Sequence, residues 1–489
     1  MNKLYAGFAR VNVTPATGIG IAGYFQTRIA DGVLDELEIN ALALACGEKK
    51  VVMLSMDHLG MKREVVQDYR KHITKITGLP SEAVYIHGTH THTAPFLLKD
   101  TDDIRIQEYD KFVCDKMTDA AMFALDDLKP ARMGWGIGMA PGVAFVRRFR
   151  MKDGSVKTNP GVNNPDILAP IGEVDERVTV LRFDRENAES LVLVQFANHP
   201  DTVGGNKLSA DWPGFLRRTV EKSLDHVKCI FFNGAQGDVN HVKVFPKGGD
   251  LNDMFLDFDD VSRGYGHARY IGRVVAGGVL QVYDKVKYMD IEDLRYTQRT
   301  IKIPSNMPKP EDMPEAHRIN DLHTEGRDDE LPYEGMMLTT IIADAARKVR
   351  LEHGPESFEM ELSAIAVGDI AFIGIPGEPF TGVGRALKET LGWEVVIPTC
   401  LTNGSQGYFP MKDAYDEGGY EAKSSNFCSG VSSTMTGSGA EGAATMAADS
   451  VSGLGEGGVP VGIGAGGVMP FSTPSSSGTL LSKPSPAAL

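Results

Sequence analysis

The hydrophobic pattern of the chain alternates between two periods from about residue 5 to residue 397. Short β-branched runs are typical of buried strands, and longer stretches with apolar residues at roughly 3.6-residue spacing are typical of amphipathic helices. The predicted strands are Val51–Met56, Ala83–His87, Val178–Phe183, Leu191–Phe196, Cys229–Phe232, Ile370–Ile375 and Val395–Pro398. The predicted helices are Arg63–Thr77, Tyr109–Leu128, Pro213–Leu224, Ala268–Val282, Met336–Glu352 and Thr381–Leu391. Strands alternating with helices predict an α/β fold with mixed β-sheets packed between α-helices.

The pattern changes in two segments. Ile303–Pro332 is polar and rich in proline, which predicts a long excursion on the surface. From Gly430 to Leu489 the residues Gly, Ser, Ala and Pro dominate, and charged residues are few. Such a composition leaves little to bury, so we expect one large domain over residues 1–429 and a low-complexity, flexible tail over residues 430–489.

Composition and charge indicate a globular protein and argue against some classes of partner. The 489 residues are 42% apolar and 24% charged, as in globular proteins, and a net charge of −15 argues against nucleic acid or an anionic membrane as a partner. The five cysteines are scattered without a CxxC pair, which is typical of a reducing compartment. The sequence shows no signal-peptide pattern and no apolar run long enough for a transmembrane segment, so we expect a cytoplasmic protein.

Residues able to bind a metal or move a proton follow nearly every predicted strand. In chain order these are Asp57-His58, His90-Thr91-His92, Asn198-His199-Pro200-Asp201, Asn233–Asp238, Glu378 and Thr402–Tyr408. Ligands of α/β sheets bind beyond the carboxyl ends of the strands, so these residues are expected to meet at one place.

His90 and His92 form a His-x-His pair at a strand end. On an extended backbone, residues i and i+2 point to one face, as a metal site requires. With His199 and Glu378 after other strands, the pair predicts a metal centre, and this donor set favours zinc over calcium or magnesium. Two plainer interpretations stay open: polar strand ends with surface histidines, and a Glu378 that only favours the dipole of the following helix.

Motifs of several other enzyme classes are absent from the sequence. There is no GxSxG nucleophile elbow, no GxxxxGK[ST] phosphate loop and no HExxH zinc motif. An ordinary α/β-hydrolase triad, a P-loop nucleotide site and a zincin are therefore not expected.

Six short blocks, in order along the chain, resemble the neutral/alkaline non-lysosomal ceramidase family over about Tyr5 to Ser429. The blocks are Gly7–Pro15, Gly88–Pro95, Phe196–Pro200, Asn233–Val239, Pro376–Phe380, and Asn403–Tyr408 continuing to Tyr420–Ala422. The resemblance implies a catalytic domain over residues 1–429 that hydrolyses the amide bond of a small N-acyl substrate with one zinc ion per chain. The family places two histidines, a glutamate and a tyrosine on the zinc, which implies His90, His199, Glu378 and Tyr408 as ligands here.

The resemblance also implies catalytic roles. His92 would act as general base on the attacking water and later protonate the leaving amine. Arg147 and Tyr420 would stabilise the oxyanion, although the adjacent Arg148 is an alternative for the arginine. The residues expected to orient the ligands are Asn233, Gln236 and Asp238.

The sequence also departs from the family pattern. Thr93–Phe96 stands where the family usually has Ser-Gly-Pro-Gly, and Val146 replaces an asparagine. With no signal peptide and no alternating strands for a C-terminal immunoglobulin-like domain, the pattern favours a short, non-secreted relative that acts on a smaller or more polar amide than ceramide. The alternatives are a zinc-dependent esterase or other acyl hydrolase, an inactive metal-binding scaffold, and a purely structural α/β protein.

Overall fold

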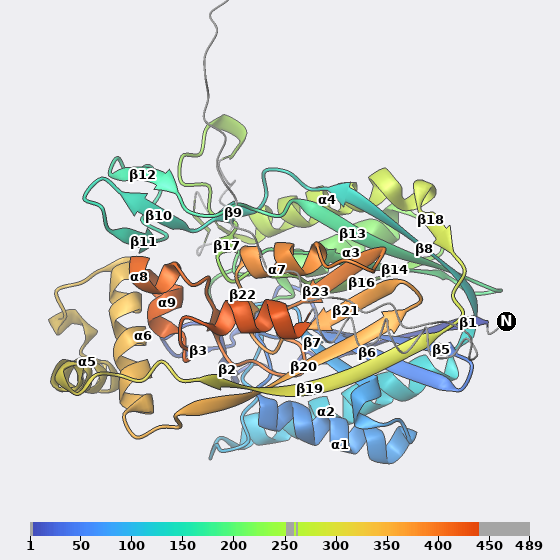
Figure 1. Cartoon of the computed structure of the whole chain (residues 1–489), viewed down its shortest axis with the longest axis horizontal. Coiled ribbons are helices and arrows are strands. Elements are labelled where there is room, and N and C mark those ends of the chain that lie inside the picture. The colour runs from blue at the N-terminus through green and yellow to red at the C-terminus, as the bar shows by residue number, and fades with distance from the viewer. Residues whose placement is uncertain (1–2, 251–258, 261–262, 440–489) are drawn as a thin grey trace, which may run out of the picture.

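The buried β-branched runs form one large mixed sheet (Figure 1). The computed structural model describes residues 3–250, 259–260 and 263–439. The nine strands, in spatial order, are β16 (Val227–Asn233), β14 (Ser190–Phe196), β13 (Arg177–Arg185), β8 (Lys129–Met139), β1 (Leu4–Asn12), β5 (Glu38–Cys46), β6 (Lys49–Met56) and β7 (Val84–Gly88), with β18 (Lys287–Met289) beside β8. The outermost pairs, β14–β16 and β6–β7, are parallel, and the inner pairs are antiparallel. The predicted mixed sheet is confirmed.

The two ends of this sheet approach each other. Ser55 Oγ in β6 donates to the carbonyl of Phe231 in β16 at 2.6 Å. The backbone N–H of Asn233, also in β16, donates to His87 Nε2 in β7 at 3.0 Å. Because β7, β14 and β16 are three of the strands followed by predicted polar loops, this closure brings those loops together.

A second sheet completes the arrangement. Its four strands are β19 (Leu294–Pro304), β20 (Ser357–Val367), β21 (Ile370–Gly374) and β23 (Val395–Thr399), of which β21 and β23 are parallel. The loop after β23 returns to the large sheet, where Cys400 N–H donates to the carbonyl of Asn233 at 3.0 Å and Asn403 N–H to that of Ile86 at 2.8 Å. The carboxyl ends of both sheets therefore meet.

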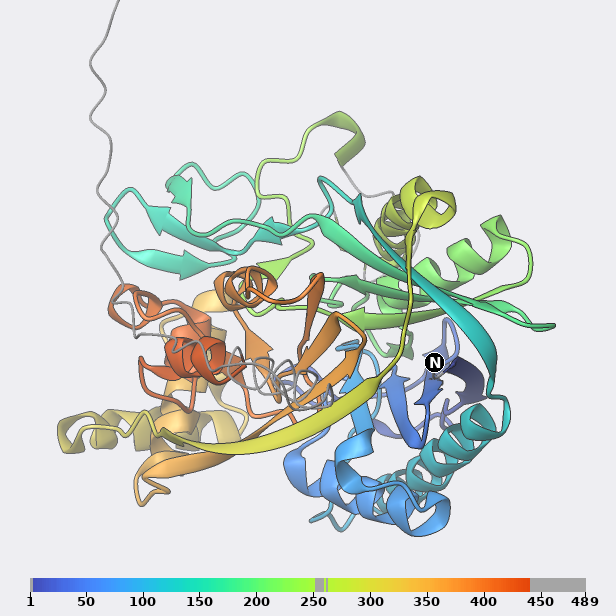
Figure 2. The same ribbon diagram turned by 45° about the vertical axis from the view of Figure 1, so that its right-hand side comes forward.

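Helices cover the outer faces of the sheets (Figure 2). Helix α1 (Arg63–Thr77) packs on α2 (Ile104–Asp126), which covers β1, β5 and β6. Helix α3 (Asp211–Ser223) covers β16, and α4 (Tyr265–Val282) covers β8 and β13. Helix α7 (Thr381–Lys388) covers β23. Apolar side chains from each helix fill the hydrophobic cores against these strands.

Smaller elements surround the region where the sheets meet. One is a three-stranded sheet of β10 (Arg148–Met151), β11 (Val156–Thr158) and β12 (Ile167–Pro170). Four two-stranded pairs are β2 (Gly20–Ile21) with β3 (Arg28–Ile29), β4 (Gly32–Val33) with β15 (Lys207–Leu208), β9 (Phe145–Val146) with β17 (Val239–Asn240), and β22 (Glu378–Pro379) with β24 (Tyr408–Phe409). The short helices α8 (Ala414–Glu417) and α9 (Tyr420–Ser424) lie in the same region. These short pairings fix the loops that carry the polar residues.

The segment Ile303–Pro332 is more ordered than the predicted surface excursion. It contains helix α5 (Met313–Thr324), which packs on α6 (Gly335–Leu351). The buried contacts come from Met313, Ala316, Ile319, Leu322, Leu331, Ile342 and Ala345. Of the prolines that suggested a loop, Pro314 lies in the first turn of α5, where its missing N–H costs nothing. The apolar residues behind it recur every three positions, as on one helix face.

The ordered domain extends beyond residue 429, the predicted boundary. Residues 431–439 are helical, and Val431 and Met435 are buried in the core under α7. The rest of the predicted tail, residues 440–489, lies outside the described residues. In the part of the chain that the structure describes, no helix is both long and apolar enough to cross a membrane.

Candidate metal centre

The His90–His92 pair lies on a sharp turn just after β7. His90 has a φ of 80°, a left-handed conformation that is strained for a residue other than glycine. Hydrogen bonds hold the turn: His90 N–H donates to the carbonyl of His58 at 2.8 Å, and Thr91 Oγ1 donates to that of Ser209 at 2.7 Å. The expectation of an extended backbone is therefore wrong, because the turn, rather than strand alternation, brings the two imidazoles together.

The Nε2 atoms of His90, His92 and His199 converge on one point. His90 Nε2 lies 2.9 Å from His199 Nε2 and 3.3 Å from His92 Nε2, and all three ligand atoms lie within 4.8 Å of one another. Each Nδ1 instead faces a backbone carbonyl. In the order of the histidines, the carbonyls belong to Leu59 (2.5 Å), Gly23 (3.0 Å) and Gln236 (3.4 Å). A carbonyl can only accept, so each Nδ1 carries the proton and each Nε2 presents its lone pair to the shared point.

Burial favours the neutral form of His92 and His199. It lowers the pKa of His92 to about 4, and it lowers the pKa of His199 well below its usual value, with the Arg147 charge acting in the same direction. Metal ions bind the neutral form of histidine. His92 and His199 are thus in the form that can hold a metal at neutral pH.

Glu378 adds a carboxylate to the cluster. Its Oε2 lies 3.2 Å from His90 Nε2 and 3.8 Å from His199 Nε2, and it accepts a hydrogen bond from Gln236 Nε2 at 3.3 Å. Burial alone would raise the pKa of Glu378, but His90 and Arg147 outweigh it and the pKa is lowered. Glu378 lies in β22, ahead of α7, so the plainer interpretation as an acid in the first turn of that helix does not hold.

Arg147 and two tyrosines lie beside the carboxylate. Tyr408 in β24 is paired in register with Glu378 in β22. The ring centroids of Tyr408 and Tyr420 are 5.6 Å apart, and Arg147 Cζ lies 5.4 Å from the centroid of Tyr408. The three side chains therefore form one group at the edge of the histidine cluster.

Of the two adjacent arginines, the structure favours Arg147 for the site. Arg148 Nη2 donates to Glu417 at 3.1 Å and to the carbonyl of Gly418 at 3.0 Å. Arg147 forms an ion pair with buried Glu421 at 2.7 Å and lines the same cavity as His92 and His199.

A cavity of about 400 Å³ opens onto the cluster. Of the residues with implied roles, those that line it are His92, Arg147, His199, Tyr408 and Tyr420. His90 and Glu378 contact the histidines that line it. The structure thus brings the implied ligands, His92, Arg147 and Tyr420 together around this cavity, which we call the histidine cavity.

The residues expected to orient the ligands differ in what they contact. Gln236 contacts Glu378 directly. Asn233 Nδ2 donates to the carbonyls of Thr89 at 3.1 Å and Asn198 at 3.0 Å, and so joins the two histidine loops. Asp238 accepts instead from the N–H of Thr381 at 2.7 Å and holds the start of α7.

Sequence reasoning missed part of the site. Tyr24, whose ring centroid is 5.7 Å from that of His92, contacts both Asp201 and Arg263 through its hydroxyl. Arg263 also forms an ion pair with Asp201 at 2.9 Å, and the same carboxylate oxygen lies 3.8 Å from His92 Nδ1. Tyr24 and Arg263 lie far from any predicted strand end, so only the fold could reveal them. Glu421 carried a signal, because it sits inside the Tyr420–Ala422 block.

The donor set fits a metal ion. Three imidazoles and a carboxylate converge, and each imidazole is oriented by a carbonyl, which is the usual support of metal-ligating histidines. Nitrogen donors with one carboxylate are typical of zinc and other transition metals rather than of calcium or magnesium. His92 Nε2 lies 3.3 Å from His90 Nε2, slightly farther than His199 Nε2 at 2.9 Å, so geometry alone makes His92 either a ligand or a base.

Comparisons with known proteins show likeness in fold. No protein-family model matches the sequence, and no curated protein matches it. The crystal structure of neutral ceramidase from Pseudomonas aeruginosa is similar with a TM-score of 0.69 and 15% identity, covering 92% of this chain and 75% of that one. A ceramidase complexed with C2 is similar with a TM-score of 0.68 and 15% identity, covering 92% of this chain and 76% of that one. The chain therefore has the fold of the ceramidases.

Proposed function

We propose that the protein is a zinc-dependent hydrolase that cleaves the amide bond of an N-acyl substrate. The observation that carries the proposal is the convergence of His90, His199 and Glu378 beside an open cavity. The fold supports it, because its structural neighbours are ceramidases, and so do the sequence blocks that resemble that family.

The ligands in this proposal are His90, His199, Glu378 and Tyr408, with one zinc ion per chain. A bound zinc ion supplies Lewis acidity, which lowers the pKa of a coordinated water and polarises the substrate carbonyl. Tyr408 joins the set through its pairing with Glu378 across β22 and β24. Burial raises the pKa of Tyr408 well above its usual value, so it needs a cation beside it to act as a phenolate ligand.

His92 takes the proton of the attacking water in this scheme. Its Nδ1 donates to the carbonyl of Gly23 at 3.0 Å, so the basic Nε2 points into the site. The low pKa of His92 keeps that nitrogen free at neutral pH. The charge of Asp201 near Nδ1 favours the protonated ring, so His92 can then pass the proton to the leaving amine.

Arg147 and Tyr420 stabilise the negative oxygen that develops on the carbonyl. Arg147 is held by the ion pair with Glu421 at 2.7 Å and by a hydrogen bond to the carbonyl of Gly237 at 2.7 Å. The backbone of Tyr420 donates to Thr158 Oγ1 at 3.1 Å. Groups fixed in this way need no reorganisation during the reaction, and one such donor typically contributes about a hundredfold or more in rate.

The departures from the family pattern at Thr93–Phe96 and Val146 favour a smaller or more polar amide than long-chain ceramide. The test is hydrolysis by the zinc-loaded protein of matched amide and ester pairs, with long-chain ceramide in the same panel. We expect turnover of short amides, lost in His92→Ala. Turnover of esters alone would identify an esterase, and no turnover with zinc bound would identify a scaffold. Efficient turnover of ceramide would contradict the expected preference.

A further inference from the structure

One polar residue at a strand end, Asp57, has no role in the proposed chemistry. It directly follows β6, and its side chain is fully buried. Arg217 in α3 donates to both of its carboxylate oxygens, from Nη1 to Oδ1 at 2.9 Å and from Nη2 to Oδ2 at 2.6 Å. Removing either partner would leave an uncompensated buried charge, so the two side chains hold each other in place.

The other hydrogen bonds of Asp57 connect the end of β6 to the turn that carries His90. Asp57 N–H donates to the carbonyl of Glu38 at 2.9 Å, and Glu38 N–H donates to Asp57 Oδ2 at 3.0 Å. Asp57 Oδ1 also accepts from Thr89 Oγ1 at 3.3 Å. The N–H of Thr89 donates to the carbonyl of Met56 at 2.9 Å. Both the strand end and its carboxylate therefore hold Thr89, which directly precedes His90.

The two residues after Asp57 hold His90 itself. The carbonyl of His58 accepts the N–H of His90 at 2.8 Å, and the carbonyl of Leu59 accepts the proton on His90 Nδ1 at 2.5 Å. The ring of His58 is fixed in turn, since its Nε2 lies 3.0 Å from the carbonyl of Pro95. A left-handed φ of 80° is unfavourable for histidine and persists only where surrounding contacts impose it. The segment of residues 57–59 supplies such contacts.

From these contacts we infer that Asp57, held by Arg217, is a positioning residue that fixes the His90 imidazole in the proposed metal centre. The inference rests on the proposed function in taking His90 as a metal ligand. The direction of His90 Nε2 depends on where the carbonyls of residues 58 and 59 lie, and the carboxylate of Asp57 fixes the start of that segment. Groups that orient a ligating histidine typically contribute about 10- to 100-fold in metal affinity.

The first test measures the affinity of the metal-free protein for Co²⁺, followed by the cobalt absorption bands at equilibrium. In Asp57→Asn we expect the affinity to fall by about 10- to 100-fold and the bands to shift, because the ligand geometry changes. Asp175→Asn is the matched control. Asp175 is also buried, and Arg177 donates to both of its oxygens at 2.7 and 2.9 Å. Because Arg177 and its other partner, Lys388, lie outside the proposed metal centre, this control should keep the wild-type affinity and bands.

A second pair of variants separates positioning from stability and still applies if Asp57→Asn does not fold. Thr89→Val keeps the shape of threonine but lacks the hydroxyl that donates to Asp57, whereas Thr89→Ser keeps that hydroxyl. We expect Thr89→Val to weaken Co²⁺ binding by about tenfold and Thr89→Ser to retain the wild-type affinity. Urea denaturation gives the stability of each variant. An affinity loss that follows the unfolding free energy in every variant, Asp175→Asn included, would leave Asp57 a purely stabilising role.

Two further outcomes overturn the inference: wild-type affinity and unchanged bands in Asp57→Asn, and equal affinities in Thr89→Val and Thr89→Ser. If the wild type binds no metal, the proposed function fails instead, and crystal structures of the metal-free wild type and of both Thr89 variants decide. A His90 φ that leaves the left-handed region in Thr89→Val but not in Thr89→Ser supports the inference. A φ that stays near 80° in both variants refutes it.

Discussion

His90 and His92 belong to one turn, and we propose that His90 is a metal ligand and His92 the general base. His90 Nε2 lies 2.9 Å from His199 and 3.2 Å from Glu378, at the centre of the donor set. His92 lines the open cavity and lies near Asp201, as a residue that exchanges protons should. The distinction between ligand and base is open to direct measurement.

We predict that His92→Ala retains zinc and loses activity. Loss of a general base typically lowers kcat by about 10² to 10⁴-fold, while the remaining ligands still hold the ion. Elemental analysis and steady-state kinetics on the same preparation check both parts. Loss of zinc in His92→Ala would make His92 a ligand and would require a different base.

His87 illustrates how a buried histidine makes stability depend on pH. Its Nδ1 faces the carbonyl of Cys400 at 2.8 Å, and its Nε2 accepts the N–H of Asn233 at 3.0 Å. Both nitrogens are therefore used by the neutral ring, and burial lowers the pKa of His87 from 6.5 to about 3. Below pH 6.5 the unfolded chain binds a proton that the folded chain does not, so this contribution to stability is complete above pH 6.5 and is lost as pH falls toward 3.

We predict that His87→Gln weakens this pH dependence. Between pH 6.5 and pH 5 the wild type should lose about 2 kcal/mol of unfolding free energy through His87, at about 1.4 kcal/mol per pH unit, and the variant should not. Urea denaturation at both pH values gives the difference. His353→Gln, at a side chain that is 91% exposed, is the control. Parallel loss of stability in wild type and His87→Gln would contradict the account.

At the scale of elements, strand β8 and helix α4 meet through two glycines. A Cβ on Gly138 would lie 1.9 Å from the carbonyl oxygen of Gly278, which leaves no room for a side chain. One residue earlier in the same helix, a Cβ on Gly277 would meet nothing within 4 Å. Substitutions at Gly138 and Gly277 therefore report separately on close packing and on helix propensity.

We predict opposite effects of alanine at these positions. Gly138→Ala should destabilise the fold by about 1 to 3 kcal/mol, because β8 or α4 must move. Gly277→Ala should stabilise it by about 0.5 to 1 kcal/mol, since alanine is the better helix former. Thermal or urea unfolding measures both. Equal effects of the two substitutions would show that β8 and α4 do not approach as described.

The elements that the sequence predicted are correct because their signals are local, but the equally buried strands β5 and β20 were not among them. Each predicted strand and helix overlaps one in the structure, such as β21 and α1, where β-branched runs and 3.6-residue spacing are unambiguous. Helix α5 was missed because a proline that begins a helix looks like a proline in a loop. The turn at His90 was missed because its left-handed backbone depends on hydrogen bonds from residues distant in sequence.

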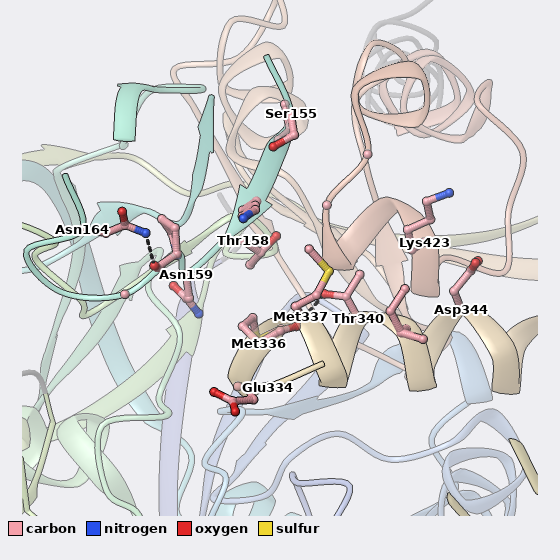
Figure 3. Close-up of a pocket in the computed structure, with 18 of the residues that line it drawn as sticks. Ser155, Thr158, Asn159, Asn164, Glu334, Met336, Met337, Thr340, Asp344 and Lys423 are labelled. Atoms are coloured by element: carbon pink, nitrogen blue, oxygen red, sulfur yellow. Dashed lines mark hydrogen bonds between the residues drawn. The ribbon is translucent and has the colours of Figure 1, made fainter. Parts of the chain in front are cut away.

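The candidate site residues could be predicted where they directly follow a strand or belong to one of the six sequence blocks. The histidines, Glu378 and Tyr408 all belong to such blocks. Tyr24 and Arg263 were not predictable, because tertiary contacts alone place them beside His92. The same limit applies to the cavity between β11, the start of α6 and the segment that joins α8 to α9 (Figure 3), because no sequence pattern predicts that these elements meet.

On the scale of the whole molecule, the proposed ligands join the two sheets. His90 and His199 follow strands of the large sheet, whereas Glu378 and Tyr408 follow strands of the smaller one. A metal bound to all of them ties the sheets together. Ligands that bind only the folded state stabilise it, by about 4 kcal/mol at a thousandfold excess over Kd.

We predict that chelation lowers the melting temperature of the wild type and that added zinc restores it. His90→Ala, which lacks a ligand, should melt at the same temperature with and without zinc. Differential scanning calorimetry with the chelator and after zinc addition makes the comparison. A zinc-dependent shift of equal size in His90→Ala would place the stabilising ion elsewhere.

The proposed zinc centre joins the two sheets. Its most direct test is the metal content of the wild type, His90→Ala and Glu378→Ala, purified without added metal and measured by elemental analysis. We predict about one zinc per wild-type chain and the loss of that zinc in both variants. No zinc in the wild type, even after zinc is added back, would contradict it and leave only the fold in common with the ceramidases.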